Sequence, residues 1–567
     1  MKELREKVVG LLAGASGRTA SDLEAALEIP PKPEQGDLAL PCFRWAKEEK
    51  ISPPELANRW KEALLAHLPA EFDRVEVQGG YLNFFLKRSF VSRSVLTEIR
   101  KSAGKYGFVT KKPAPVAVIE YSSPNIAKPF SIGHLRSTNI GAALSRIFAA
   151  RGWRVVQLNH LGDWGTQFGK LISAYRRWGK AEMLAEKPME ALYKLYVRFH
   201  EEEVSDPTLI EEARDWFARL EQKDPEAQEL WEWFRELTMR ELERIYKMLG
   251  VSFDHYWGES FYTDRLPGLL EDLEEKNLTK ISEEATVIDL EPYGLPTCLI
   301  KKKDDSSLYL TRDIAAAIYR FDQLKFDRMI YVVGAPQRLH FQQLFKVVEL
   351  MGYSWADRLE HIMFGHISFG DESMSTRRGN IVFLAEVIDR ATDLANKIVA
   401  EKNPDLENRN EVARQVGLGA ILYADLSAKR IKDVKFSWEE MLSFEGETGP
   451  YLQYTFVRAQ SILRKWGQPI DETAALENLT TDEESALVRE LSHFPMVLAK
   501  AEMEREPFLI AQYLIDLTKN FNRFYTTQRI LDAPPELAKA RVVLVSGFAE
   551  LLKTGLKLLG IPTPDRM

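Results

Sequence analysis

The sequence predicts an α/β protein that is built around a parallel sheet, with a small α/β domain before the sheet and an all-α bundle after it. Three observations lead to this prediction. An apolar strand, a helix and a second apolar strand follow one another between residues 116 and 158. Helix and strand patterns alternate before residue 102, and from Arg409 to Gly560 the pattern is almost entirely helical.

The first 110 residues are expected to form the small domain. Helical patterns lie around Leu23 and at 54–67, strand patterns lie at 74–77 and 81–86, and a linker rich in lysine, glycine and proline covers 104–115. In the second strand, alternation puts Tyr81 and Asn83 on one face and Leu82 on the other. This arrangement is typical of a half-buried strand with one polar face.

The most informative segment is the turn that follows the apolar strand Val116–Glu120. Gly133 and His134 stand there at the start of a helical pattern. Phosphates bind at helix N-termini beyond the ends of parallel strands. The segment therefore favours a nucleotide site.

Each residue of this turn also has an ordinary explanation. Gly133 could permit a tight turn, His134 could simply begin a helix, and Lys128 could be a solvated surface lysine. In a nucleotide site, a missing side chain lets a flat adenine ring approach the backbone. A histidine can donate a hydrogen bond to phosphate oxygens, and a lysine can supply a fixed positive charge.

A second informative segment is the small polar loop at 371–380. It follows a predicted strand at 361–369 and precedes a helical pattern at 384–401. The loop could be a solvated turn. Its backbone donors and arginines could also clamp a pyrophosphate leaving group, which needs positioning and charge neutralisation more than covalent chemistry. Between the two segments, a helical stretch dense in Glu, Arg and Trp at about 171–262 is interpreted as an inserted subdomain.

The composition excludes several classes of protein. The chain has 567 residues, 45% of them hydrophobic, which is enough for several folded domains. Two cysteines, Cys42 and Cys298, leave no disulfide framework and no zinc-ligand spacing. The sequence has no run of about 18 apolar residues and a charged N-terminus, so we expect a soluble, cytoplasmic protein without membrane segments.

The net charge of −8 is unusual for a protein that binds RNA, since phosphate contacts need lysine and arginine. Local basic patches decide binding, however. Candidate patches are Lys111-Lys112, Arg176-Arg177, Lys301-Lys302-Lys303 and Lys429-Arg430-Ile431-Lys432. Most short runs of this kind are merely solvated, so none is assigned to a partner.

The two informative segments together resemble the HIGH and KMSKS signatures of class I aminoacyl-tRNA synthetases, and most closely those of the arginyl-tRNA synthetases. The resemblance extends over nearly the whole chain. Its matching segments are 79–84, 122–138, 159–167, 309–313, the Met374 loop, 444–454 and 565–567.

The resemblance implies three domains and one activity. The domains are an N-terminal α/β domain at 1–110 that meets the corner of tRNA, a Rossmann-like catalytic domain at 111–408, and a helical anticodon-binding domain at 409–567. The implied enzyme is a monomer that ligates L-arginine to tRNA(Arg), with ATP as co-substrate and Mg²⁺ offsetting phosphate charge. No editing domain is expected.

The chain departs from the signatures at three positions. Ser131 replaces the first histidine of HIGH, so only His134 supplies an imidazole there, and Ser373 and Thr376 replace the two lysines of KMSKS. The resemblance implies that Lys128 supplies the missing positive charge. The expected catalytic and ATP-binding residues are Lys128, Ser131, Gly133, His134, Met374, Ser375, Thr376 and Arg377.

An arginine pocket must contain acid, because a guanidinium matches a carboxylate in bidentate fashion. Asp313 follows a predicted extended run at 307–310 and is expected to open a helix at 312–319, with Tyr309 at the end of the strand. An aspartate there could merely compensate the helix dipole. The resemblance implies that Asp313 and Tyr309 grip the guanidinium. It assigns further arginine contacts to Glu120, Ser123, Pro124, Asn125, His134 and Gln337.

The resemblance also implies contacts to tRNA. Tyr81 and Asn83 of the N-terminal domain would contact bases by stacking and amide hydrogen bonds. Tyr451, Tyr525 and Met567 match positions near the anticodon. Packing in the core of the helical bundle is the competing explanation for both tyrosines.

Two other classes of function are weighed against this one. A small nucleotidylyltransferase shares a similar turn, but it lacks the long helical C-terminal region and the acid pocket. A catalytically inactive, RNA-binding relative would explain Ser131 and the altered Met374 loop. Retention of His134, Lys128 and the predicted arginine pocket argues against that alternative.

Overall fold

The computed structural model describes residues 2–30, 33–301, 309–369 and 383–567. The chain divides into two compact units. The first consists of Met1–Tyr106, Arg458–Pro495 and Asp516–Thr554, and the second of Gly107–Val457, Met496–Ile515 and Gly555–Met567. In the described ranges, no helix combines the length and the apolar character that a membrane crossing requires.

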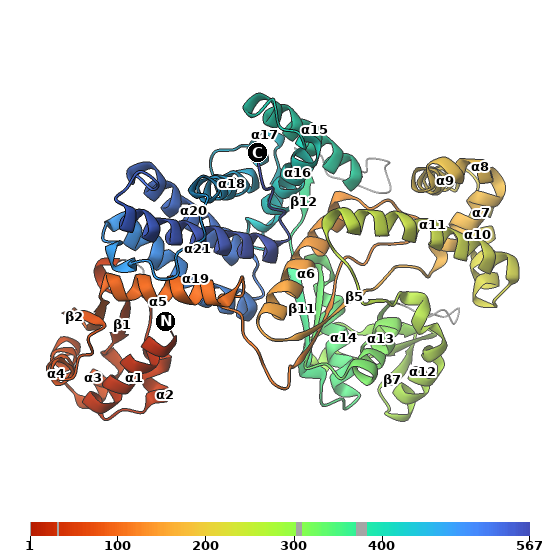
Figure 1. Ribbon diagram of the computed structural model, residues 1–567. Coiled ribbons are helices and arrows are strands. Elements are labelled where there is room, and N and C mark those ends of the chain that lie inside the picture. The colour runs from red at the N-terminus through yellow and green to blue at the C-terminus, as the bar shows by residue number, and fades with distance from the viewer. Residues whose placement is uncertain (1, 31–32, 302–308, 370–382) are drawn as a thin grey trace. The chain divides into compact units, whose positions relative to one another are not determined.

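The N-terminal part of the first unit packs helices against a three-stranded antiparallel sheet of order β1-β3-β2 (Figure 1). Its elements are α1 (Lys2–Ser16), α2 (Ala20–Ala26), η1 (Pro33–Gln35), β1 (Leu38–Pro41), α3 (Phe43–Glu49), α4 (Pro53–Leu65), β2 (Phe72–Gln78), β3 (Tyr81–Leu86) and α5 (Arg88–Ser102). Trp45 of α3 and Trp60 of α4 pack together in its core, with ring centres 5.5 Å apart. The helices and strands predicted for this region are confirmed.

The predicted polar face of β3 is wrong at one residue. Tyr81 is exposed and lies edge-on to Phe43, whereas Asn83 is buried together with Leu82. Both faces of β3 are covered beyond its first residue, so the alternation of side chains no longer separates solvent from core.

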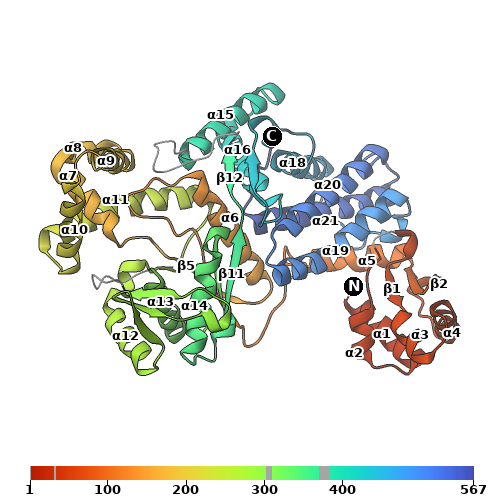
Figure 2. The same ribbon diagram turned by 180° about the vertical axis from the view of Figure 1, so that it is seen from behind.

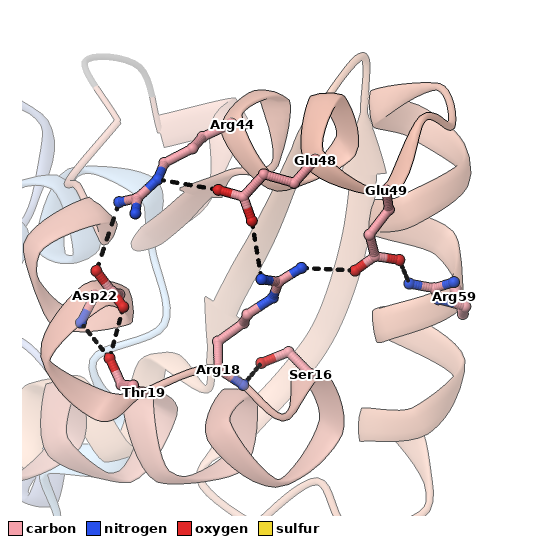
Figure 3. Close-up of polar contacts among 8 residues, drawn as sticks. All are labelled: Ser16, Arg18, Thr19, Asp22, Arg44, Glu48, Glu49 and Arg59. Carbon is pink, nitrogen blue, oxygen red and sulfur yellow. Dashed lines mark hydrogen bonds and ion pairs between the residues drawn. The ribbon is translucent and has the colours of Figure 1, made fainter.

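A set of exposed and half-buried charged side chains on the surface joins α2, α3 and α4. Figure 3 shows these residues, called the surface network below: Arg18, Asp22, Arg44, Glu48, Glu49 and Arg59. Arg18 lies 2.9 Å from both Glu48 and Glu49, and Arg59 pairs with the other oxygen of Glu49. Hydrogen bonds from Arg59 and Arg18 lower the pKa of Glu49.

The second unit contains a five-stranded parallel sheet of order β11-β10-β4-β5-β6. Its strands are β4 (Val116–Glu120), β5 (Arg154–Asn159), β6 (His255–Tyr256), β10 (Arg328–Gly334) and β11 (Leu359–Phe364). Helix α6 (Ile132–Ala150) connects β4 to β5, so the predicted strand–helix–strand unit is confirmed. The central strands are buried on both faces, as an apolar parallel sheet requires.

A helical insertion separates β5 from β6. It consists of α7 (Thr166–Trp178), α8 (Ala181–Glu186), α9 (Pro188–Glu202), α10 (Thr208–Glu221) and α11 (Pro225–Leu249). Both views show α7 to α10 grouped around one end of the long helix α11 (Figures 1 and 2). The other end of α11 leads back to the sheet, which lets this helix support the loop after β4.

The remaining elements before α15 cover the sheet or form small additions to it. They are η2 (Glu259–Arg265), α12 (Leu266–Glu275), β7 (Thr279–Ser282), β8 (Ala285–Ile288), η3 (Glu291–Tyr293), β9 (Cys298–Lys301), α13 (Tyr309–Leu324), η4 (Ala335–Gln337), α14 (Arg338–Leu350), η5 (Ala356–Arg358) and β12 (Ile367–Phe369). Strands β7, β8 and β9 form an antiparallel sheet of their own. Helices α13 and α14 contribute most of their apolar side chains to the core of the parallel sheet.

The single strand predicted at 361–369 is wrong, because the chain forms β11 and β12 in different sheets. Gly365 separates them: its N–H donates to the Arg430 carbonyl, and a Cβ atom there would lie 2.6 Å from Asp433 Oδ1. This close approach requires glycine and redirects the chain.

The C-terminal third is nearly all helical, as predicted. Its elements are α15 (Leu384–Lys402), α16 (Arg409–Leu426), β13 (Val434–Phe436), α17 (Trp438–Met441), α18 (Gly449–Trp466), η7 (Leu476–Asn478), α19 (Asp482–Glu504), α20 (Phe508–Thr527) and α21 (Pro535–Leu559). The short strand β13, which pairs with β12, has no counterpart in the prediction.

Candidate functional site

The candidate site lies at the carboxyl ends of β4, β5 and β10. The chain passes from β4 outward to β5 and β6, and later returns to β10 on the opposite side of β4. Such a reversal of strand order opens a crevice for ligands outside the strand ends. The turn after β4, His160 after β5 and Gln337 after β10 all belong to this edge of the sheet.

His134 lies in the first turn of α6, and one of its ring nitrogens already accepts a hydrogen bond. The backbone N–H of Ser131, the residue before α6, donates to His134 Nδ1 at 3.1 Å. Burial and the charge of Lys128 lower the pKa of His134 to about 4. The ring is therefore neutral at physiological pH, and because Nδ1 accepts, its proton is on Nε2, which can donate to a ligand.

Gly133 is not required by the packing of the protein. A Cβ atom there would meet only Ser131 Oγ, at an ordinary 3.5 Å, and its backbone lies outside the left-handed region. The space above this residue is open. This observation favours the prediction that a flat ligand approaches the backbone here.

The loop between β4 and α6 is strained and tightly fastened. Ser122, Ser123 and Ala127 have positive φ angles of 72°, 46° and 60°. Helix α11 holds the loop: Tyr246 OH bonds Ser122 Oγ at 2.8 Å, and Thr238 Oγ1 accepts from the Ala127 N–H at 3.0 Å. Such strain persists only where surrounding contacts enforce it, and it gathers at binding sites.

Three more predicted residues lie in the same loop. The carbonyl of Pro124 accepts from the Gly162 N–H, and a Cβ atom on Gly162 would overlap Asn125 Oδ1. Ser123 Oγ is buried without a hydrogen-bond partner among the described residues. A buried hydroxyl without a partner is costly, so it is available to a bound ligand.

Lys128 lies where the insertion meets the loop. Its ammonium is 5.1 Å from the centre of the Tyr196 ring of α9. Since its charge also lowers the pKa of His134, it lies near the imidazole, as the prediction of a positive charge at this site requires.

A second group of side chains, called the buried cluster below, adjoins the end of β4. Its members are Glu120, His160, Asp313, Arg320 and His340. Glu120 Oε2 lies 2.5 Å from Arg320 Nη1, and both side chains are almost wholly buried. Glu120 is the last residue of β4, two residues before Ser122, so the cluster and the loop that leads to α6 share one strand end.

Asp313 is bracketed by two imidazoles. His340 Nε2 lies 2.6 Å from its Oδ2 and His160 Nε2 lies 3.5 Å from its Oδ1. Burial raises the pKa of Asp313, but the hydrogen bonds from His160 and His340 outweigh burial and hold it well below its usual range. The carboxylate is thus ionised and 24% exposed, which suits it to bind a cation.

A further carboxylate lies beside this cluster. Glu259, at the start of η2, is 3.6 Å from Arg312 and its Oε2 has no hydrogen-bond partner among the described residues. Burial raises the pKa of Glu259 to about 7, against the opposing charges of His160 and Arg312. The site therefore contains three acids, Glu120, Glu259 and Asp313.

The prediction that Tyr309 ends a strand is wrong. Tyr309 begins α13, four residues before Asp313, so the two side chains lie on the same face of one helix. Residues 307 and 308 of the predicted extended run lie outside the described residues. Gln337, the last residue of η4, is exposed after β10.

Met374, Ser375, Thr376 and Arg377 lie outside the described residues. The described chain resumes at Phe383, which forms an antiparallel bridge with Ser131, and the Leu384 N–H donates to the Phe130 carbonyl. Phe383 and Leu384 therefore lie beside the N-terminus of α6.

The residues predicted to contact tRNA have different environments. Tyr525 in α20 is 40% exposed, with the Arg458 guanidinium 4.9 Å from its ring centre, so core packing does not account for it. Tyr451 is half-buried near the start of α18. The carbonyl of Met567 accepts from Asn403 at 3.3 Å. Among the candidate basic patches, Lys111, Arg176 and Arg177 form ion pairs with glutamates.

Three family models match the chain in order. They are the arginyl tRNA synthetase N terminal domain over residues 2–86, the catalytic domain of class I (R) tRNA synthetases over 96–438 and the DALR anticodon binding domain over 452–567. The arginine–tRNA ligases of Alkaliphilus metalliredigens and Halothermothrix orenii are each 44% identical to it, with 100% of both chains covered. The chain belongs to the arginyl-tRNA synthetase family.

The solved structures agree with this assignment. The Thermus thermophilus arginyl-tRNA synthetase matches this synthetase with a TM-score of 0.84 and 29% identity, over 100% of both chains. The Plasmodium falciparum enzyme, at 22% identity and a TM-score of 0.81, shares the fold. The predicted family and the predicted fold class are both confirmed.

Sequence reasoning missed four charged residues of this synthetase. His160 lies in a segment that resembles the family, but no role was assigned to it. Arg320 follows Asp313 by seven residues, two helical turns, which places both on one face of α13. His340 and Glu259 come from separate elements, and no spacing in the sequence relates them to Asp313.

Proposed function

We propose that this chain ligates L-arginine to tRNA(Arg) in two steps at the carboxyl ends of β4, β5 and β10. In the first step the arginine carboxylate attacks the α-phosphorus of ATP, which forms arginyl-adenylate and releases pyrophosphate. In the second, a ribose hydroxyl of the terminal adenosine of tRNA attacks the activated carbonyl and AMP leaves. The observation that carries the proposal is the ionised carboxylate of Asp313 beside the strand end that leads to His134.

Asp313 and Glu259 bind the guanidinium in this proposal. Two carboxylates facing a delocalised cation provide the bidentate contact that a guanidinium requires. Tyr309 closes the pocket from the first turn of α13. Because Glu120 is already paired with Arg320, its role is to keep the pocket balanced in charge and to face the α-amino group.

The opposite end of arginine binds to the strained loop. Ser123 Oγ offers an unused hydroxyl, and Asn125 is fixed against Gly162. With Pro124 shaping the loop and Gln337 at the end of η4, just after β10, these groups would orient the carboxylate for in-line attack. Orientation of this kind is the main source of catalysis where no covalent enzyme intermediate forms.

ATP binds over Gly133 at the N-terminus of α6. His134 Nε2–H donates to the phosphates, Ser131 and the helix N-terminus face them, and Lys128 adds positive charge. Met374, Ser375, Thr376 and Arg377 complete the ATP site. Within the described residues, no three His, Cys, Asp or Glu side chains are gathered in a way that could hold a metal ion. In this proposal Mg²⁺ comes with the nucleotide substrate, as MgATP, and offsets phosphate charge.

Both ends of the chain take part in binding tRNA. Tyr81 is exposed and can stack on a base of the tRNA corner, whereas Asn83 is buried and presents no surface to a base. Tyr451, Tyr525 and Met567 would meet the anticodon. The enzyme acts as a monomer in the cytoplasm.

Exchange between pyrophosphate and ATP tests the proposal. With arginine and tRNA present, the wild-type chain should catalyse exchange, and without tRNA it should not. Asp313→Asn should lower kcat/KM for arginine by at least about 10³-fold, because the guanidinium loses its charged partner. Asp322→Asn, the same change at an exposed position of α13, is the matched control and should change it less than twofold.

Two results would count against the proposal. If Asp313→Asn kept a kcat/KM for arginine within tenfold of the wild-type value, Asp313 would not be a residue of the arginine pocket. No exchange by the wild type under any condition would favour the catalytically inactive relative.

A further inference from the structure

Helix α6 carries two buried polar side chains on the face opposite His134. Arg136 follows His134 by two residues, which turns it roughly 200° around the helix axis. Asn139 lies three residues after Arg136, on the same face of the helix. Only 1% of the Arg136 side chain is exposed. A buried charge on a largely apolar helix is costly, so its contacts indicate its role.

The guanidinium of Arg136 bonds two backbone segments at once. Its Nη1 donates to the His366 carbonyl at 3.0 Å, and its Nη2 donates to the Arg430 carbonyl at 3.1 Å. His366 lies between β11 and β12, and Arg430 lies in the turn between α16 and β13. One planar, rigid group of donors therefore links α6 to both segments.

The second residue of this face, Asn139, bonds α16. Asn139 Nδ2 donates to the Leu422 carbonyl at 3.1 Å and to Asp425 Oδ2 at 2.8 Å. The other oxygen of Asp425 lies 3.4 Å from Arg136 Nε, and the Asp425 side chain is wholly buried. Asp425 is thus both the counter-ion of Arg136 and an acceptor for Asn139, which ties this face of α6 to α16.

The turn that Arg136 binds is itself fixed by several contacts. The Arg430 carbonyl also accepts from the Gly365 N–H at 2.9 Å, and Arg430 Nη1 donates to the Met363 carbonyl at 2.8 Å. The Glu506 carboxylate accepts from the Arg430 N–H at 3.1 Å. Arg136 therefore anchors α6 to a part of the structure that is held from several directions.

Polar contacts hold the opposite side of α6 as well. Ser137 Oγ donates to the Val332 carbonyl at 2.7 Å and accepts from the Ser122 N–H at 2.9 Å. Thr138 Oγ1 donates to Ser122 Oγ at 2.9 Å. Hydrogen bonds thus fix α6 on two sides, one turn after His134. Because hydrogen bonds are directional, these contacts define the rotation and the position of the helix more closely than apolar contacts alone.

We propose that Arg136 and Asn139 are positioning residues: they hold the first turns of α6 from the face opposite His134, so that His134 meets the phosphates of ATP in the productive geometry. This role rests on the proposed function, because it assigns the phosphates to His134. Neither Arg136 nor Asn139 touches the substrate. Both act by keeping the imidazole where the transition state needs it.

Pyrophosphate–ATP exchange by the full-length chain, at saturating ATP and tRNA, tests this role. Arg136→Lys keeps a positive charge beside Asp425 but cannot reach two carbonyls at once, so kcat should fall about 10²-fold. The KM for arginine should change by less than about threefold, because the acids of the arginine pocket are untouched.

Arg541→Lys is the matched control. Arg541 and Glu484 form another buried ion pair, with atoms 2.7 Å apart and side chains 7% and 0% exposed, between α21 and α19. This change should lower the melting temperature as Arg136→Lys does, but it should leave kcat within about twofold of the wild-type value. Equal losses of kcat in the two variants would show a general effect of destabilisation and would overturn the role of Arg136.

A double variant separates positioning from a general loss of structure. If Arg136 acts through His134, adding Arg136→Lys to His134→Ala should lower kcat by less than about a further threefold. If the two losses multiply in full, the role of Arg136 is overturned and the proposed function stands. An absence of exchange by the wild type overturns both.

Asn139→Ala keeps the proposal testable if Arg136→Lys does not fold. It removes a neutral side chain from the same face of α6, and it should lower kcat about tenfold with an unchanged KM for arginine. A wild-type kcat in Asn139→Ala would show that this face of α6 does not position His134.

Discussion

The surface network and the buried cluster contain the same kinds of side chain in opposite surroundings. In the surface network, Arg18 and its partners Glu48 and Glu49 are each more than a quarter exposed (Figure 3). In the buried cluster, Arg320 and Glu120 are 1% and 5% exposed. Water and salt can replace any partner in the first group, whereas in the second a charge that loses its partner stays unsolvated.

The comparison shows which charges the enzyme depends on. Exposed ion pairs contribute little because the free charges are well solvated. A buried charge is tolerated only while it keeps its partner. Replacing the whole buried pair by apolar groups often leaves the stability of the protein unchanged. In the proposed function the buried cluster keeps charge beside the substrate, so its stability would be a condition of that function.

The largest expected effect comes from breaking the buried pair. Arg320→Met should lower the free energy of unfolding by about 3–5 kcal/mol, because it leaves the buried Glu120 side chain without its ion-pair partner. Chemical denaturation monitored by fluorescence and circular dichroism measures this loss. Adding Glu120→Gln to the same chain should recover a large part of it, since the unpaired charge is then gone. A double variant as unstable as Arg320→Met would show that packing of the guanidinium, and not charge, decides the stability.

The next effect depends on pH. Burial raises the pKa of Glu259 from 4.5 to about 7, so between these values the folded state binds a proton that the unfolded state has lost. The contribution of this group to stability therefore falls as pH rises. Glu259→Gln cannot ionise, and its stability relative to wild type should increase by about 3 kcal/mol from pH 4.5 to pH 7.5.

Denaturation of both proteins across this range measures the difference. Glu271→Gln, the same change at an exposed position of α12, is the control and should track the wild type at every pH. A flat difference for Glu259→Gln would show that burial does not raise the pKa of Glu259 in the folded protein.

The same comparison explains what the sequence could predict. The turn with Lys128, Gly133 and His134 is contiguous, so its residue types and spacing are enough to raise the hypothesis of a nucleotide site, which stays a prediction. The buried cluster comes from β4, the end of β5, α13 and α14, and only Glu120 and Asp313 were predicted, through family resemblance. No pattern along the chain relates His160 or His340 to Asp313, because the fold alone brings them together.

Two errors have the same origin. The sequence pattern predicts extended backbone at Tyr309, but Tyr309 begins α13, whose apolar side chains from Leu310 onward pack into the core of the sheet. Asn83 was placed on a polar face because alternation assumes one solvated side, and both sides of β3 are covered after Tyr81. In each case tertiary packing overrides the local preference.

The smallest expected effect comes from removing an arginine of the surface network instead of one of the buried cluster. Arg18→Met makes the same substitution as Arg320→Met but removes a half-buried arginine, 28% exposed, from the surface network. Its two ion pairs, at 2.9 Å each, should together contribute about 1 kcal/mol or less, because Glu48 and Glu49 regain water and Glu49 keeps Arg59. The loss of stability should shrink further at 1 M NaCl, where the Debye length is about 3 Å.

If denaturation instead shows Arg18→Met to be as destabilising as Arg320→Met, burial is not what separates the two groups. Because both variants carry the same new side chain, the ratio of their effects isolates the surroundings of the charge from the identity of the residue.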